Sequence, residues 1–405
     1  TAERFPDRNC LTVFEAERIT LTYRETLAAI RKLAGWLVAH GVKKGSHVAV
    51  SGKNSSEWAI VYLSVLYAGG TIIPIDYGLH DYEIASLLKT AKPLFFFVDA
   101  EKYEYFLTES KKQSFMGEIY ALNAQYPDRY VYQLEAEALS TYIPVQETDT
   151  AAILFTSGTM GHPKGVMLSH KNIVSDCYIA QSNLTIFETD IFYALLPIHH
   201  SYTMVAVFIE AISVGAEIVF GKSLVVSRML RELKEGQITM LLGVPLLFNK
   251  LLAGIMKGVR SKGVLVYGII RFLMGISYLV KKTTGKNIGK KLFKSVLEKA
   301  NLTTLRIAIS GGGPLSKEVF RAYNEFGIDF VQGYGLTETS PIIALNPKEH
   351  FKIESVGSYF HPYMEMKILA PDENGRGEIC AKGPMIMQGY YNMPEETAAV
   401  LSEDG

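Results

Sequence analysis

Apolar residues follow two alternating spacings along the first part of the chain. A capping box at 22–25 precedes apolar residues spaced as on one face of a helix, and Gly41 ends that pattern. Short apolar runs typical of buried strands follow at 47–50, 71–75 and 95–98. Between them lie helical stretches for which Asn54 and Asp81 are the expected caps. Strands that alternate with helices predict a mostly parallel, doubly wound sheet.

The same alternation resumes after residue 150 and then changes character. Expected strands lie at 192–196, 217–220, 238–242 and 305–309, and Ser316 is expected to cap a later helix. Beyond about residue 330 the chain has short β-like runs with Gly and Pro, such as 378–381, which suggest a small antiparallel or barrel-like part. We therefore predict an α/β protein with two doubly wound sheet subdomains, at about 1–150 and 151–330, and a β-rich subdomain at 331–405.

The composition supports a large folded core and narrows the range of partners. Of 405 residues, 48% are hydrophobic and 20% charged, so extended disorder is not expected. The formal net charge is zero, which gives no reason to predict a nucleic-acid partner. Cys10, Cys177 and Cys380 are far apart, so they indicate neither a zinc site nor a disulfide framework and fit a reducing compartment. The first residues lack the apolar segment of a secretory signal.

A loop rich in glycine and hydroxyl groups lies between two apolar runs at 153–168. Glycines let backbone N–H groups point into one concavity, hydroxyls add donors and a lysine adds positive charge, which together suit an oligophosphate. The loop is not a Walker A motif, because a proline precedes the lysine and a strand-like run follows it. We expect it to join two strands; the alternative is an ordinary flexible hairpin loop. The candidate phosphate ligands are Thr156, Ser157, Gly158, Thr159, Gly161 and Lys164.

Two further segments with candidate ligands each follow an expected strand. His199 and His200 are adjacent, so their side chains diverge and the pair is a poor metal signature; either could be a hydrogen-bonded structural histidine. Gly311, Gly312 and Gly313 form a turn whose bare backbone could accommodate a flat ligand, or simply a tight strand-to-helix turn.

The segment at 332–340 reads QGYGLTETS. Tyr334 lies between two glycines and offers an open ring face for stacking. Thr337 supplies a hydroxyl group, and Glu338 supplies a hard oxygen ligand suited to Mg²⁺. The alternative interpretation of Glu338 is a solvated acid in a loop.

Four segments in this order, TSGTMGHPKGV, LPIHHS, SGGGPL and GYGLTET, resemble the adenylate-forming superfamily of acyl-CoA synthetases, luciferases and peptide-synthetase adenylation domains. The resemblance covers nearly the whole chain. It extends to GEICAKGP at 377–384 and GYYN at 389–392, a block that we take as structural.

The resemblance implies ATP or AMP, Mg²⁺ and the co-substrate CoA as ligands. It also implies that Tyr334 stacks on adenine, that Thr337 contacts the α-phosphate and that His200 lies near the acid substrate. The residues implied to take part in catalysis are Thr156, Lys164, His200 and Glu338, and those implied to bind magnesium are Thr159 and Glu338. The residues implied to bind nucleotide are Thr156, Ser157, Gly158, Thr159, Gly161, Lys164, Gly311, Gly312, Gly313, Gln332, Gly333, Tyr334, Gly335 and Thr337.

The resemblance further implies what would follow residue 405. In the family an aspartate turn that holds the ribose comes next, and then a small C-terminal domain with the lysine that drives adenylation. We expect the chain to be the large N-terminal portion of such an enzyme, and to bind nucleotide weakly and adenylate poorly or not at all.

The basic helical insert at 250–297 indicates the class of acid. It is rich in lysine and arginine, lacks acidic residues and contains the apolar run 264–280, which is at the lower length limit for a membrane span. Arg271 at the centre of that run would cost roughly 2.5–3.5 kcal/mol in a bilayer. We therefore expect either a buried helix or contact of 257–294 with an anionic membrane surface. The insert resembles that of the long-chain fatty acyl-CoA synthetases.

The predicted reaction is ATP-dependent activation of a long-chain fatty acid to an acyl-adenylate, followed by thioester formation with CoA. The expected location is the cytoplasm, with peripheral contact at the inner membrane surface. The alternatives are a ligase for another carboxylic acid, a ligase that passes the acyl group to a carrier protein, and a fragment that binds nucleotide or lipid without catalysis. The sequence predicts no oligomeric state.

Overall fold

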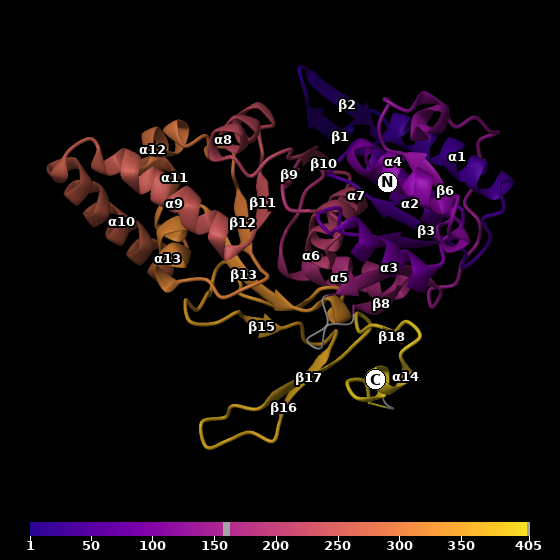
Figure 1. Cartoon of the computed structure of the whole chain (residues 1–405). Coiled ribbons are helices and arrows are strands. Elements are labelled where there is room, and N and C mark those ends of the chain that lie inside the picture. Colours follow the sequence, from indigo (N-terminus) through magenta and orange to yellow (C-terminus); the bar gives the residue numbers. More distant parts are fainter. Residues whose placement is uncertain (157–162, 403–405) are drawn as a thin grey trace.

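The computed structural model describes residues 1–156 and 163–402. Two sheets enclose a central layer of helices, and further helices cover the outer face of each sheet (Figure 1). Buried apolar side chains form one large core between the two sheets and a smaller core under each outer layer of helices. The α/β architecture with two doubly wound sheets is thus confirmed.

A seven-stranded sheet contains β3 (His47–Ser51), β4 (Thr71–Pro74), β5 (Phe95–Val98), β6 (Glu118–Ala121), β7 (Thr150–Thr156), β8 (Lys164–Ser169) and β18 (Gly389–Tyr390). Its strand order is β18-β8-β7-β4-β3-β5-β6, parallel from β7 to β6 and antiparallel at β8 and β18. In β3, Val48 and Val50 belong to the central core, whereas Ala49 belongs to the outer core. Because both faces are covered, the strand is apolar at consecutive positions.

A nine-stranded sheet contains β1 (Asn9–Phe14), β2 (Arg18–Thr22), β9 (Ile191–Ala194), β10 (Glu217–Phe220), β11 (Met240–Gly243), β12 (Ile307–Ser310), β13 (Asp329–Gly335), β14 (Ile342–Leu345) and β15 (Ser358–Tyr359). Its order is β15-β14-β13-β12-β11-β9-β10-β1-β2, with antiparallel strands only at the two edges.

The helices divide among three layers. The central layer has α1 (Tyr23–Ala39), α2 (Ser56–Tyr67), α5 (His170–Asn183), α6 (Ser201–Thr203), the π-helical η4 (Met204–Ile209) and α7 (Glu210–Val214). The seven-stranded sheet is covered by α3 (Asp81–Ala91) and α4 (Ala100–Ser110). The nine-stranded sheet is covered by α8 (Val226–Glu235), α9 (Pro245–Arg260), α10 (Val264–Thr284), α11 (Gly289–Leu292), α12 (Lys294–Lys299) and α13 (Lys317–Glu325). The short helices η1 (Ser114–Met116), η2 (Pro127–Arg129), η3 (Val131–Gln133), η5 (Thr337–Thr339) and α14 (Pro394–Ala398) lie in connections.

The predicted caps are confirmed where the signal is local. Thr22 and Glu25 form the capping box that starts α1, and Ser316 accepts the N–H of Val319 at the start of α13. The prediction that Asn54 caps α2 is wrong, because Ser55 takes that role and Asn54 reaches across to another part of the chain. The prediction that Asp81 caps α3 is also wrong, because Asp81 is the first residue of the helix and His80 is its N-cap.

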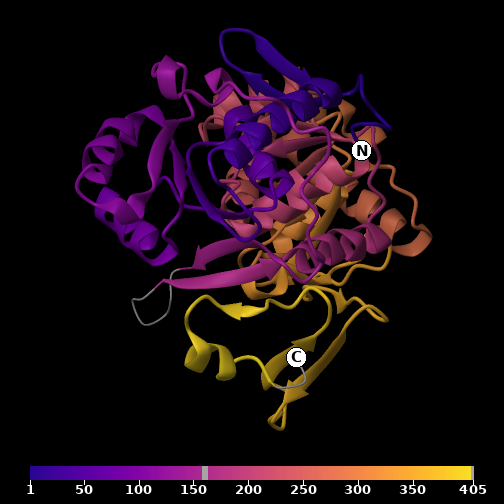
Figure 2. The ribbon, with the colours of Figure 1, turned by 90° about the vertical axis from the view of Figure 1, so that its right-hand side faces the viewer.

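Sheet membership crosses the boundary predicted at residue 150 in both directions. β1 and β2 join the nine-stranded sheet, whereas β7 and β8 join the seven-stranded sheet. The short strands after residue 331 are divided among three sheets, and β16 (Glu365–Leu369) and β17 (Glu378–Lys382) form an antiparallel ribbon that projects from one end of the molecule (Figures 1 and 2). The chain therefore returns to both sheets near its end, and this brings distant motifs together.

Candidate active site

Two of the motifs lie side by side in the nine-stranded sheet. The glycine turn follows the end of β12, and Gln332 to Gly335 form the end of the neighbouring parallel strand β13, where Ser310 pairs with Gln332. The carboxyl ends of parallel strands are where open α/β sheets bind ligands. The fold thus brings together Gly311, Gly312, Gly313, Gln332, Gly333, Tyr334 and Gly335.

Close backbone packing explains two of these glycines. A Cβ on Gly335 would lie 1.6 Å from the carbonyl oxygen of Pro341, so a larger residue does not fit. A Cβ on Gly311 would lie 3.0 Å from Cζ of Tyr202, whose hydroxyl donates to the carbonyl of Ile309 at 3.0 Å. Tyr334 is half-buried, which leaves part of its side chain accessible for the predicted stacking.

The glycine-rich loop joins two antiparallel strands, as predicted. Thr156, the last residue of β7, pairs with Lys164, the first residue of β8, and the Thr156 hydroxyl donates to the Lys164 carbonyl at 3.4 Å. The predicted ligands Ser157, Gly158, Thr159 and Gly161 lie outside the described residues. The structure therefore describes both ends of the loop, and they lie side by side.

Tyr390 connects this hairpin to the QGYGLTETS segment. β18 pairs with β8 and places Tyr390 opposite Val166. Nζ of Lys164 lies 4.7 Å from the centroid of the Tyr390 ring, and the Tyr390 hydroxyl donates to Oε1 of Glu338 at 2.8 Å. Lys164 and Glu338 thus lie on opposite parts of one tyrosine side chain and share one site.

The residues at this place suit a hydrated magnesium ion. Glu338 is half-buried, and its hydrogen bond to Tyr390 uses Oε1, so Oε2 has no hydrogen-bond partner within 1–156 and 163–402. Magnesium commonly binds one or two protein carboxylates together with phosphate oxygens and water. Glu338 therefore fits the predicted ligand role, whereas Thr159 lies outside the described residues.

Thr337 connects the same segment to the histidine pair. Oγ of Ser201 lies 3.1 Å from Oγ1 of Thr337, and Ser201 directly follows His200. The rings of His199 and His200 are 4.1 Å apart between centroids; His199 is buried, whereas His200 is only partly shielded and keeps contact with solvent. The fold thus places His200 beside the segment that carries Glu338.

Asp76, two residues after the end of β4, contacts the buried member of this pair. Its Oδ1 lies 3.4 Å from Nε2 of His199, a contact that lowers the pKa of Asp76 to about 2 while burial opposes the shift. Partial burial lowers the pKa of His200 to about 4; the neighbouring His199 adds to the effect and Asp76 opposes it. His200 is therefore neutral at pH 7 and can exchange hydrogen bonds without adding charge.

Asn54 fixes the loop that carries the histidines. Its Nδ2 donates to the carbonyls of Ala194 and Leu196, each at 2.8 Å, and its Oδ1 accepts the N–H of Ile198 at 3.0 Å. Asn54 belongs to the connection after β3 in one sheet, whereas the loop follows β9 in the other. One buried amide thereby positions the two sheets at the site.

The structure places the described candidates in one region but also shows residues that the sequence did not single out. Tyr390 lies in the block interpreted as structural only, and it contacts both Lys164 and Glu338. Its GYYN segment resembled a known block but carried no local chemical signal. The sequence pattern likewise gave no signal for the contacts of Asp76 and Tyr202. The chemical roles of all these residues stay predictions.

Comparisons with known proteins identify the family and the fold. The sequence model of the family described as "AMP-binding enzyme" matches residues 1–391. Long chain acyl-CoA synthetase 6, peroxisomal, of Arabidopsis thaliana is 28% identical, covering 95% of this chain and 58% of that protein. 4-Coumarate–CoA ligase CCL1 of Humulus lupulus is 27% identical, and the match covers 99% of this chain and 70% of that protein. The crystal structure of apo MatB from Rhodopseudomonas palustris has a TM-score of 0.77 at 24% identity, covering 99% of this chain and 72% of that one, and shows the same fold.

Proposed function

The chain belongs to the AMP-binding enzyme family, and from that premise we propose that it forms the nucleotide-binding part of an acid–CoA ligase. The proposed reaction joins a carboxylate to the α-phosphate of ATP with release of pyrophosphate. The thiol of CoA then displaces AMP and forms a thioester. The chain spans 58% of the length of the plant acyl-CoA synthetase to which it is similar, so the activity is proposed for the protein at its full length.

One observation carries this proposal: the contact of Tyr390 with both Lys164 and Glu338. Through Tyr390, the cation of Lys164 lies near the carboxylate of Glu338. The two ends of the loop rich in N–H and hydroxyl donors lie at the same place. Such a set of groups can bind the triphosphate of ATP together with its cation.

The chemical difficulty is that the attacking carboxylate and the triphosphate are both anionic. In this proposal Thr156 and Lys164 donate to phosphate oxygens and reduce their charge, and Thr337 donates to the α-phosphate. Glu338 would hold Mg²⁺, which supplies Lewis-acid neutralisation of the phosphates when bound. His200, neutral at pH 7, lies beside Thr337 through Ser201 and would orient the acid without adding charge.

A carboxylate-dependent exchange of labelled pyrophosphate into ATP, measured with the protein at full length, tests the first step. We expect exchange only when an acid is present, and loss of exchange in Lys164→Ala. CoA and a pantetheinylated carrier protein, supplied separately, identify the acceptor. An exchange rate that does not depend on the acid, or that is the same in Lys164→Ala as in the parent, would count against the proposal.

A long-chain fatty acid is the substrate that we propose. The relatives include a long-chain acyl-CoA synthetase but also a 4-coumarate–CoA ligase, so they do not separate the two classes of acid. The support comes from α10, a 21-residue helix whose most apolar part is only 17% buried. A panel of acids from acetate to palmitate, with coumarate, tests the assignment; a higher rate with coumarate than with any fatty acid would contradict it.

The outer face of α10 carries a stripe of large apolar residues. Leu265 is 78% exposed, Phe272 is 70% exposed and Leu279 is 60% exposed, with Ile269 and Ile276 between them. These positions are three or four residues apart, so they lie on one face of the helix. An exposed apolar stripe of this length on a soluble fold marks an interaction surface.

We propose that the stripe lies on an anionic membrane surface from which the fatty acid comes, with the enzyme in the cytoplasm and peripheral at the inner membrane. The insert 250–297 has no acidic residue, which favours anionic lipid. By length and composition α10 could also cross a bilayer. Its inner face is held to the domain, since Lys281 donates to Asn324 and Asp329 at 2.8 Å each and Arg271 lies 3.9 Å from Glu325. These contacts favour surface binding.

Flotation with phosphatidylglycerol-containing vesicles tests the membrane contact. The triple variant Leu265→Gln, Phe272→Gln, Leu279→Gln should lose recovery with the vesicles, because it removes the three most exposed residues of the stripe without touching the buried Met274. The matched control changes exposed apolar residues elsewhere, Ile19→Gln and Val174→Gln. Equal recovery of the triple variant and the control would contradict the proposal.

A further inference from the structure

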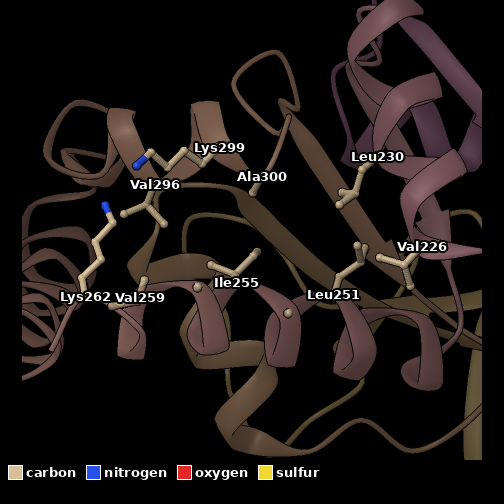
Figure 3. A pocket seen from close by; sticks show the side chains of 11 residues that line it. Val226, Leu230, Leu251, Ile255, Val259, Lys262, Val296, Lys299 and Ala300 are labelled. Atoms are coloured by element: carbon tan, nitrogen blue, oxygen red, sulfur yellow. The ribbon is translucent and has the colours of Figure 1, made fainter. Parts of the chain in front are cut away.

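An apolar groove lies on the outer helical layer of the nine-stranded sheet, between α8, α9 and the end of α12 (Figure 3). Including its open mouth it encloses about 590 Å³. Its walls are formed mainly by Val226, Leu230, Leu251, Ile255, Val259 and Val296. These helices pack on the outer core, whereas His200 follows β9 beside the central core, so the groove is separate from the candidate active site.

The floor of the groove is bare helix backbone. Gly254 and Gly258 line it from α9, four residues apart and therefore on one face of the helix. A Cβ added to either glycine would meet no atom within 4 Å. Glycine inside a helix costs roughly 1 kcal/mol relative to alanine. Packing within this chain does not require glycine here, and the two residues leave open space for a ligand.

Two lysines mark one end of the groove. Lys262 and Lys299 lie at the same end, and their amino groups point toward each other (Figure 3). The nearby Lys299 lowers the pKa of Lys262. No acidic residue lines the groove, and neither lysine has a carboxylate partner among the residues that the structure describes. Two neighbouring cations without a counter-ion favour an anion.

We propose that this groove binds a single-chain anionic amphiphile, with the alkyl chain along Gly254 and Gly258 and the head group at Lys262 and Lys299. From Leu251 to Arg260 the helix rises about 14 Å, and Lys262 lies in the turn that follows, a span that suits a long alkyl chain and exceeds the length of a short acid. The shared chemistry of the head group is an anion, either carboxylate or phosphate. The inference does not depend on the catalytic proposal.

Photolabelling with a diazirine-bearing palmitate, mapped by peptide mass spectrometry, tests the site directly. We expect labelled peptides from α8 and α9. Gly258→Leu should abolish this labelling because its side chain fills the open space, and loss of a helical glycine does not weaken the helix. The matched control is Gly275→Leu in α10, where an added Cβ also meets nothing and no groove residue is touched. Labelling that persists in Gly258→Leu, or that maps only to residues outside the groove, would overturn the proposal.

Calorimetry with laurate, dodecyl phosphate and dodecyltrimethylammonium tests the charge. The double variant Lys262→Glu, Lys299→Glu should bind both anions at least about tenfold more weakly. Lys286→Glu lies outside the groove and should bind them with the affinity of the parent chain. The ratio of laurate to dodecyl phosphate affinity identifies the preferred head group. Equal affinity for the cationic and anionic amphiphiles would contradict the proposal. Neither photolabelling nor calorimetry depends on ATP or on turnover. Failure of the catalytic proposal would therefore leave both results of this test unchanged.

Discussion

The hydroxyl of Tyr390 donates a hydrogen bond of 2.8 Å to Oε1 of Glu338. The two residues are joined through the pairing of β18 with β8, which also brings the Tyr390 ring to Lys164. A short strand near the end of the chain therefore sets the relative position of the lysine after the glycine-rich loop and of the carboxylate suited to magnesium. If this contact organises the nucleotide site, its removal should affect nucleotide binding more than folding.

Tyr390→Phe tests this point because it removes only the hydroxyl group. The ring and its contact with Lys164 stay, but Glu338 loses a donor, and a hydrogen bond to a charged group contributes roughly 1.5–3 kcal/mol. We expect Mg·ATP to bind about tenfold more weakly by calorimetry, with a small change in thermal midpoint. Tyr391→Phe is the matched control, since the Tyr391 hydroxyl has no hydrogen bond within the described ranges. Equal affinities of the two variants would show that the contact is structural only.

Glu338→Gln and Lys164→Ala should differ in their dependence on magnesium. A glutamine amide carries no charge, so Glu338→Gln should weaken Mg·ATP binding about tenfold and leave ATP binding in EDTA nearly unchanged. Lys164→Ala removes a cation that faces phosphate, so binding should weaken in both conditions. Calorimetry with and without magnesium measures the difference. The same magnesium dependence in both variants would contradict the separate roles.

The sequence predicted the elements whose signals are local. Thr22 and Glu25 act within one helical turn, and the apolar runs are strands because both faces of each sheet are covered. Tertiary contacts were not predictable in this way. Asn54 has the residue type of a helix cap, because asparagine commonly caps helices, yet its amide donates to the carbonyl of Ala194, 140 residues away in the sequence. Tyr390 offered no pattern at all, since its role depends on β18 pairing with a strand far away in the chain.

Asn54→Ala should destabilise the fold strongly. It removes one acceptor and two donor contacts from a buried position and leaves the N–H of Ile198 and the carbonyl of Leu196 without a partner in the described part of the chain, whereas the carbonyl of Ala194 still accepts the N–H of Gly221. Each unsatisfied buried group costs about 1–3 kcal/mol, so we expect a loss of roughly 3 kcal/mol or more in urea unfolding. Ser55→Ala removes only the cap of α2 and should cost about 1 kcal/mol. A loss in Asn54→Ala no larger than that in Ser55→Ala would show that the contacts across the sheets contribute little.

Glu210 makes the stability of the folded chain depend on pH. It is 2% exposed, and burial raises its pKa from 4.5 to about 7. Between these values the folded protein keeps the proton while the unfolded chain releases it, so the free energy of unfolding falls as pH rises through this window. Glutamine has a similar shape and no charge. Between pH 4 and pH 8 the free energy of unfolding should therefore fall by about 3 kcal/mol less in Glu210→Gln than in the parent chain. Urea unfolding at both pH values measures this difference, and the exposed Glu373→Gln should match the parent. A parallel pH dependence in Glu210→Gln and the parent would mean that Glu210 is charged in the fold at neutral pH.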